Sequence, residues 1–126
     1  LPTVTVDEAY HGMILLADGE DQAESFEQRQ AVLLERGVVR EAWGLEAAHE
    51  LDQGTLAYML MKTCELPPGV NNAVFGSWGL GDRRYALRTV AWHDLMPYDV
   101  PYHLVTGGEF LSALTRADEY MEQRGM

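Results

Sequence analysis

A helix-start signal occurs three times in this chain and limits the folds that are open to it. In each copy an aliphatic residue precedes a side-chain oxygen that can cap a helix, and an amphipathic run follows. The three copies are Val4-Thr5, Leu51-Asp52 and Val105-Thr106. Glu8 and Glu109 follow the two threonines at the spacing of a capping box, in which a hydroxyl and a carboxylate satisfy free amides of the first turn. The sequence therefore predicts a mainly α-helical protein.

Apolar spacing and stop signals predict five helices, over residues 6–17, 26–36, 54–65, 82–94 and 108–123. Gly19, Gly37 and Pro67 end three of them, because glycine adopts the left-handed cap and proline cannot donate the next backbone hydrogen bond. The acidic stretch 20–24 predicts a solvated loop. Residues 38–51 fit either an irregular connection or a short helix, and Val38-Val39 fits either a brief strand or simple burial.

Candidate core residues of the last helix recur at intervals of three and four, as expected for one buried face. They are Phe110, Leu111, Leu114, Ala117 and Met121. Cys64 is the only cysteine and lies in an apolar stretch. We therefore expect its thiol to be buried as a small hydrophobic group.

Length and charge limit the classes of partner. The chain has 126 residues and a mass of 14.1 kDa, which suits a single domain over residues 1–126. Its 20 acidic and 9 basic residues give a formal charge of -11, a field that repels nucleic acid and anionic lipid. No apolar run approaches the roughly 20 residues needed to span a bilayer. We expect a chain that is soluble as given and has no nucleic-acid partner.

The order of the predicted helices suggests an internal duplication. The second and third start signals, at Leu51 and Val105, stand 54 residues apart. The duplicated units would cover about 26–65 and 82–123, with an N-terminal half unit at 4–19. Stacked helix pairs would then share one core, since a single pair cannot bury both of its faces. Coincidence is the competing interpretation, because all helix starts draw on the same few capping residues.

This layout resembles the S-layer homology family. Units of that family run as a helix ending near a Gly-aliphatic pair, a loop, a short strand, and a second helix entered through a Val/Ile-Thr-Arg-Ala-Glu-Phe pattern. Here Gly37-Val38-Val39 is similar to the helix end. The second pattern is matched at four of six places by Val105-Thr106-Gly107-Gly108-Glu109-Phe110. The resemblance implies a small helical bundle of pseudo-repeated helix-loop-helix units with short extended stretches, and an exported or cell-surface role in anchoring or assembly.

The chain departs from the family at the motif arginine, which in S-layer homology domains helps to grip an anionic cell-wall polysaccharide. The corresponding positions here are Val6, Gln53 and Gly107. An acidic chain without those cations binds an anionic polymer poorly, because like charges repel. The resemblance therefore supports the architecture more than the ligand.

Two groups of residues are candidates for a docking interface. Arg83, Arg84 and Arg88 form a basic spot, and the planar guanidinium group suits a partner's carboxylates. The aromatic candidates offer a large contact area at low entropic cost; they are Phe75, Trp78, Tyr98 and Tyr102. Two alternatives remain open: the arginines pair with the chain's own acidic excess, and the aromatic rings fill the core beneath the loops.

The second functional hypothesis is metal chemistry. Two imidazoles and two carboxylates fall close together in the sequence and form a set that can hold a divalent metal in a small hydrolase or sensor. They are His93, Asp94, Asp99 and His103. A polar loop between helices explains the same residues without a metal. The glycine-rich stretch 70–81 lacks the preceding strand and the Lys-Ser or Lys-Thr pair of a phosphate loop.

Other polar residues predict local roles. His11 and His49 are isolated histidines that we expect to make local hydrogen bonds, His11 with Tyr10 or Asp7. Glu46 and Glu50 would present paired carboxylates if residues 45–51 were helical.

Together these patterns favour a non-catalytic interaction or structural module, an accessory or anchoring subunit that docks protein or cell-envelope partners. The interpretation includes no cofactor and a periplasmic or cell-surface location. The alternative is the small metal-dependent hydrolase or sensor.

Overall fold

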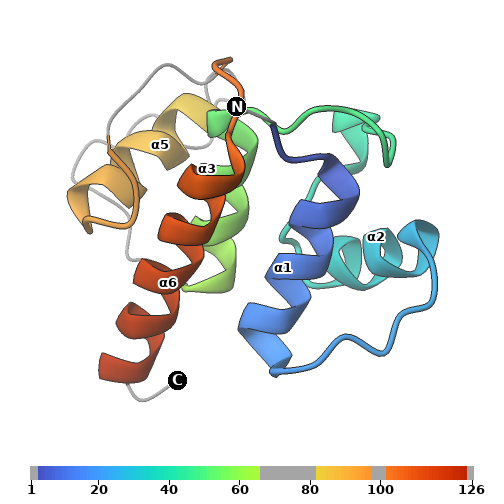
Figure 1. The fold of residues 1–126 in the computed structure, drawn as a ribbon, viewed down its shortest axis with the longest axis horizontal. Helices are drawn as coiled ribbons and strands as arrows, with labels where there is room; N and C mark the ends of the chain where they lie inside the picture. Colours follow the sequence, from blue (N-terminus) through green and yellow to red (C-terminus); the bar gives the residue numbers. More distant parts are fainter. Residues whose placement is uncertain (1–2, 66–81, 98–101, 125–126) are drawn as a thin grey trace.

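The fold is taken from a computed structural model, which describes residues 3–65, 82–97 and 102–124. Within those ranges the regular structure is helical, with isolated β-bridges in place of longer strands. The helices are α1 (Val6–Asp18), α2 (Phe26–Glu35), the short 3-10 helix η1 (Glu41–Trp43), α3 (Gln53–Thr63), α5 (Asp82–Trp92) and α6 (Gly107–Gln123). The expected mainly α fold is therefore confirmed (Figure 1).

The predicted capping residues begin the helices. Thr5 Oγ1 accepts a hydrogen bond from the Glu8 N–H at 3.3 Å, and Glu8 Oε1 accepts one from the Thr5 N–H at 3.1 Å. Thr106 forms the same complete capping box at the start of α6. Asp52 caps α3 by accepting a hydrogen bond from the Thr55 N–H at 2.8 Å. Local sequence therefore determined where these helices begin.

The ends of the first two helices follow the predicted glycines. Gly19 has φ 79° and Gly37 has φ 74°, a left-handed backbone that a residue with a Cβ adopts only with strain. The Gly19 N–H donates to the carbonyl of Leu15 at 2.8 Å, which closes the last turn of α1. Each helix is thereby stopped within one or two residues of its predicted end.

The three helix starts meet at one end of the molecule through a closed ring of backbone hydrogen bonds. The Val4 N–H donates to the carbonyl of Val105 at 2.9 Å, and the Val105 N–H donates to the carbonyl of Leu51 at 2.9 Å. The Leu51 N–H closes the ring by donating to the carbonyl of Val4 at 2.8 Å. All three side chains are buried. The aliphatic residue of each start signal thus joins the starts through its backbone and covers the end of the core with its side chain.

First-turn amides strengthen this junction. The Val6 N–H of α1 donates to the carbonyl of His49 at 2.8 Å, and the Gln53 N–H of α3 donates to the carbonyl of His103 at 2.7 Å. Amides of a first turn have no partner within their own helix, so each start depends on the neighbouring segment. Figure 1 shows the blue, green and orange segments converging near the label N.

Helix α3 is the most buried helix. All of its residues from 53 to 60 are buried, including the polar Gln53 and Thr55. It packs against α5 and α1, and α1 packs in turn against α2 and α6. In Figure 1, α5 and α2 lie on opposite sides of this central group. The core therefore draws apolar residues from each of the five α-helices that the structure describes.

A glycine lets α1 and α6 approach closely. A Cβ placed on Gly12 would lie 2.6 Å from Cζ of Phe110 and 3.2 Å from Cδ1 of Leu114. Real Cβ atoms essentially never approach other atoms so closely, so the ring of Phe110 occupies the space that a larger residue would need.

Three sequence predictions on these elements need correction or a choice. Leu111 is 65% exposed, because the buried stripe of α6 is narrow and runs through Phe110, Ala113 and Ala117. Residues 45–51 form no α-helix, so Glu46 and Glu50 do not present paired carboxylates in the way that a helix would. The connection 38–51 is irregular apart from η1 and a β-bridge at residue 50, and residues 38 and 39 are buried without forming a strand.

Candidate functional site

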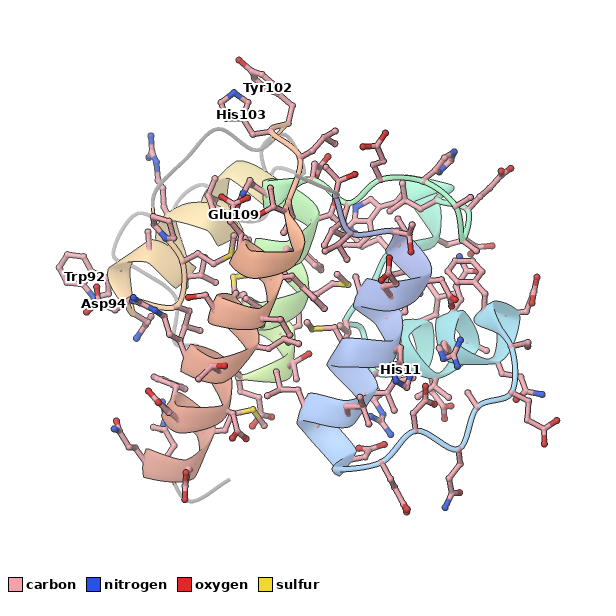
Figure 2. All side chains as sticks on the ribbon, in the orientation of Figure 1. His11, Trp92, Asp94, Tyr102, His103 and Glu109 are labelled. Atoms are coloured by element: carbon pink, nitrogen blue, oxygen red, sulfur yellow. The ribbon has the colours of Figure 1, made fainter. Side chains whose placement is uncertain are left out.

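The junction between α1 and α2 is held by a network of charged side chains. Oδ2 of Asp21 lies 2.7 Å from Nε of Arg29 and 2.6 Å from Nδ1 of His11, while Oδ1 accepts a hydrogen bond from the Ala23 N–H at 2.9 Å. Arg29 also donates from Nη1 to Asp7 at 2.9 Å. Figure 2 shows His11 on α1, at the side that faces this loop. The network connects α1, α2 and the loop between them.

The sequence predicted a solvated loop over residues 20–24, and this prediction is wrong for Asp21. The side chain of Asp21 is 1% exposed, although the His11 ring that helps to cover it is 47% exposed. The carboxylate thus lies under a thin layer of its own partners and not deep in the core. Desolvation raises the pKa of Asp21, but hydrogen bonds from Arg29, His11 and the Ala23 amide outweigh it and hold the pKa at about 2.

A hollow of about 560 Å³ lies beside this network, between α1, the loop and α2. Asp18 and Arg36 face each other across it in a bidentate pair, with contacts of 3.0 and 2.8 Å. Asp21, which also lines the hollow, is paired as described above. Two of its three acidic side chains are thus neutralised from within the chain; the third, Glu20, accepts a hydrogen bond from the Gln22 amide at 3.2 Å.

A second hollow, of about 620 Å³, separates the C-terminal turn of α5 from the outer side of α6; we name it the α5–α6 groove. Its lining includes His93, Asp94, Arg116, Glu119 and Tyr120. The His93 ring meets the Tyr120 ring edge to face at a centroid distance of 5.5 Å, and Arg116 Nη1 donates to the Asp94 carbonyl oxygen at 3.0 Å. These two contacts set the position of the turn against α6.

The carboxylates of the α5–α6 groove differ from those of the first hollow. Those of Asp94 and Glu119 make no hydrogen bond or ion pair with any residue that the structure describes. Asp94 has φ 61°, a left-handed conformation that aspartate tolerates better than most residues. The lining therefore carries two unpaired carboxylates against one guanidinium group.

Trp92 is the last residue of α5 and directly precedes His93, which lines this groove. Its side chain is 84% exposed, the highest value among the large hydrophobic residues for which burial is described. Figure 2 shows Trp92 and Asp94 projecting from the end of α5, away from the rest of the molecule. Within the described ranges no ring stacks on the indole and nothing bonds to its N–H. An indole left uncovered in this way is available to a partner.

The structure places only some of the predicted interface residues. Arg88 is exposed on α5, one turn before Trp92. Tyr102 is 72% exposed beside the start of α6, and its ring meets that of His103 at 5.3 Å, so it belongs to the surface and not to the core. Arg83 and Arg84 belong to the first turn of α5, and the surroundings of their side chains lie outside the description. Phe75, Trp78 and Tyr98 lie outside the described residues.

The candidate metal ligands are not all brought together. His93 and Asp94 are adjacent at the end of α5, whereas His103 lies beside the start of α6, well apart from Asp94 in Figure 2. Asp99 lies outside the described residues. Residues 3–65, 82–97 and 102–124 contain no group of three or more side chains of His, Cys, Asp or Glu placed to hold a metal ion.

Three further sequence predictions concern single polar groups. Cys64 is buried, and burial raises the pKa of its thiol to about 12, so it is a packing residue as expected. His49 accepts a hydrogen bond on Nδ1 from the Glu46 N–H at 2.9 Å, which confirms its local role. His11, by contrast, bonds to Asp21 in the loop and not to Tyr10 or Asp7.

Sequence reasoning missed Trp92, and helical periodicity contained the signal. The buried residues of α5 include Ala86, Leu87 and Val90. At 100° per residue, positions 88 and 92 fall on the opposite side of the helix. Arg88 and Trp92 are therefore neighbours on one exposed face. The pairing of Asp21 had no comparable signal, because its partners come from two other segments.

Comparisons with models of protein families, with curated proteins and with solved structures found no match. Among the described helices, none has the length and apolar character required to cross a bilayer.

Proposed function

We propose that this chain is a non-catalytic docking module, an accessory or anchoring subunit that binds a protein partner or a cell-envelope component. The exposed aromatic residues Trp92 and Tyr102 are the observation that carries the proposal. Tryptophan and tyrosine are enriched at the energetic centres of protein interfaces.

The distribution of exposed apolar residues supports docking through the C-terminal part of the chain. Four of the five large hydrophobic residues that the structure records as exposed belong to α5, α6 or the segment before α6. They are Trp92, Tyr102, Leu104 and Leu111, whereas Leu15 lies on α1.

The buried ionisable groups have structural roles, which also fits a module that performs no chemistry. Asp21 joins three segments through hydrogen bonds. Tyr10 stacks on Phe26 at a centroid distance of 5.2 Å, and burial raises its pKa to about 12. A catalytic base or nucleophile needs a pKa and an exposure suited to proton transfer, and neither Tyr10 nor Cys64 has them.

The architecture is proposed to be duplicated, with units at about 26–65 and 82–123 and a half unit at 4–19, similar to the S-layer homology family. The ring formed by Val4, Leu51 and Val105 supports this, since equivalent residues make equivalent bonds at each start. Repeated units that share one core suit a rigid support. The resemblance supports a periplasmic or cell-surface setting.

Hydrogen exchange with and without a cell-envelope extract tests the proposal. We expect slower amide exchange in residues 86–94 and 102–111 when the extract is present. The double variant Trp92→Ala with Tyr102→Ala should lose that protection, while Leu15→Ala, an exposed aliphatic residue on α1, should keep it. Unchanged exchange over the whole chain would refute a docking role.

A further inference from the structure

We propose that the α5–α6 groove binds an arginine or lysine side chain of a basic partner protein, with the Trp92 indole as its platform and the Asp94 and Glu119 carboxylates as its charge partners. This inference rests on the proposed docking role and adds the chemistry of the partner. No cofactor or covalent step is involved.

The exposed indole supplies the first half of the argument. The face of a tryptophan ring is the strongest aromatic site for a cation, and arginine occupies such sites more often than lysine. Trp92 is 84% exposed and has no described ring or hydrogen-bond partner. The same chain already uses this contact twice, since Arg124 lies over the Tyr120 ring at 5.5 Å and Lys62 over the Tyr58 ring at 5.6 Å.

The unpaired carboxylates supply the second half. Asp94 is two residues beyond Trp92, and Glu119 lines the opposite side of the groove. Arg116 is the cation of the lining, and its Nη1 is engaged by the carbonyl oxygen of Asp94. The lining therefore keeps an excess of negative charge, with His93 counted as neutral.

The charge of the whole chain selects the kind of partner. A second copy of this chain would also carry -11 and would be repelled at the distances where association begins. A basic protein is attracted by the same field, which raises the association rate at low salt. A basic partner with an exposed arginine or lysine is attracted by the negative field of the chain, and that side chain can bind in the groove.

The test is a titration of the full chain with an acetylated, amidated tetra-arginine peptide at low ionic strength. Binding is monitored by NMR through the indole N–H resonance of Trp92. The resonance is assigned by its loss in Trp92→Phe. We expect a saturable shift of that resonance, and no shift with a matched tetra-glutamate peptide. Salt should weaken the binding, because exposed charges are screened.

Matched variants distinguish binding in the α5–α6 groove from attraction by the net charge of the whole chain. Trp92→Ala should weaken the binding of tetra-arginine about fivefold, as measured from the shifts of backbone amide resonances. The double variant Asp94→Asn with Glu119→Gln should weaken it about three- to fivefold, and asparagine also tolerates the left-handed backbone at residue 94. The control Glu27→Gln with Glu35→Gln removes the same charge from exposed positions on α2 and should leave the affinity within about twofold.

Equal losses in the two double variants would mean that only the net charge attracts the peptide, and would overturn the groove proposal. A shift of the Trp92 resonance with tetra-glutamate would overturn its charge assignment. If tetra-arginine leaves this resonance unmoved while hydrogen exchange shows protection elsewhere, the groove proposal fails and the docking role stands. If no protection is seen with the extract, the docking role itself fails.

Discussion

The junctions α1–α2 and α5–α6 each enclose a hollow of similar size, about 560 and 620 Å³, but they treat their charges in opposite ways. At the first junction Asp18 and Asp21 are paired with arginines of α2 and its C-cap. At the second, Asp94 and Glu119 have no partner among the described residues, and Trp92 stands uncovered beside them. The first junction is closed by internal ion pairs, while the second has none for Asp94 and Glu119 among the described residues.

Net charge does not explain this difference. Residues 1–65 contain 13 acidic and 4 basic residues, and residues 66–126 contain 7 acidic and 5 basic residues. The half with the larger acidic excess nevertheless has the paired hollow. Local pairing, decided by which side chains meet, therefore distinguishes the two junctions better than the charge of the segment does.

Replacing Asp21 should reduce the stability of the protein most, because it breaks the ion pairs of the α1–α2 junction. Asp21→Asn leaves Arg29 with one carboxylate partner and removes charge-assisted hydrogen bonds. We expect a loss of about 2 kcal/mol in the free energy of unfolding, measured by urea denaturation. Glu119→Gln at the α5–α6 junction should change the free energy of unfolding by less than about 0.5 kcal/mol. Equal losses in the two variants would contradict the comparison.

Filling the close contact between α1 and α6 should reduce the free energy of unfolding somewhat less. In Gly12→Ala the new methyl group would meet the Phe110 ring at 2.6 Å, so the ring must shift within a buried contact. We expect a loss of about 1–2 kcal/mol in the free energy of unfolding. Gly108→Ala is the matched control, because its Cβ meets nothing within 4 Å, and it should stabilise the protein by about 0.5 kcal/mol. Gly12→Ala as stable as the wild type would mean that α1 and α6 are less closely packed than described.

Acid should remove part of the Asp21 contribution without any substitution. The pKa of Asp21 is about 2 in the folded chain, against an ordinary 3.8. A lowered folded pKa means that the stabilisation is fully present above about pH 4 and is lost as the pH falls toward about 2. The difference in unfolding free energy between the wild type and Asp21→Asn should therefore shrink over that range. A constant difference from neutral pH to about pH 2 would show that the carboxylate is not held as described.

Removing the exposed indole should produce the smallest effect on stability. Trp92→Ala deletes a side chain that is 84% exposed, so little buried area is lost. We expect the free energy of unfolding to change by less than about 0.5 kcal/mol. A loss of more than about 1 kcal/mol would show that the indole packs against the chain and is not free for a partner.

The sequence predicted the helical elements well, because their signals are local. Thr5, Asp52 and Thr106 cap first turns through atoms three residues away, and Gly19 and Gly37 end helices through their own backbone angles. Burial of Cys64 also followed from nearby residues, because its stretch of the sequence is apolar. Interactions within one helical turn need no knowledge of the rest of the fold.

The candidate site was less predictable. The sequence left Tyr102 open between the surface and the core, Trp92 was overlooked, and Leu111 was assigned to the core. Periodicity alone shows which residues share a face, and only the neighbouring helices decide how wide the buried stripe is. For α6 that stripe is narrow, so Leu111 falls outside it.

Local patterns along the chain specify a mainly helical, strongly acidic protein with three similar helix starts. Packing of distant segments, in contrast, closes the hydrogen-bonded ring of Val4, Leu51 and Val105. It also shelters Asp21 and leaves Asp94 without a partner among the described residues. The reason is physical: these contacts join residues far apart along the chain, and their partners are set by packing.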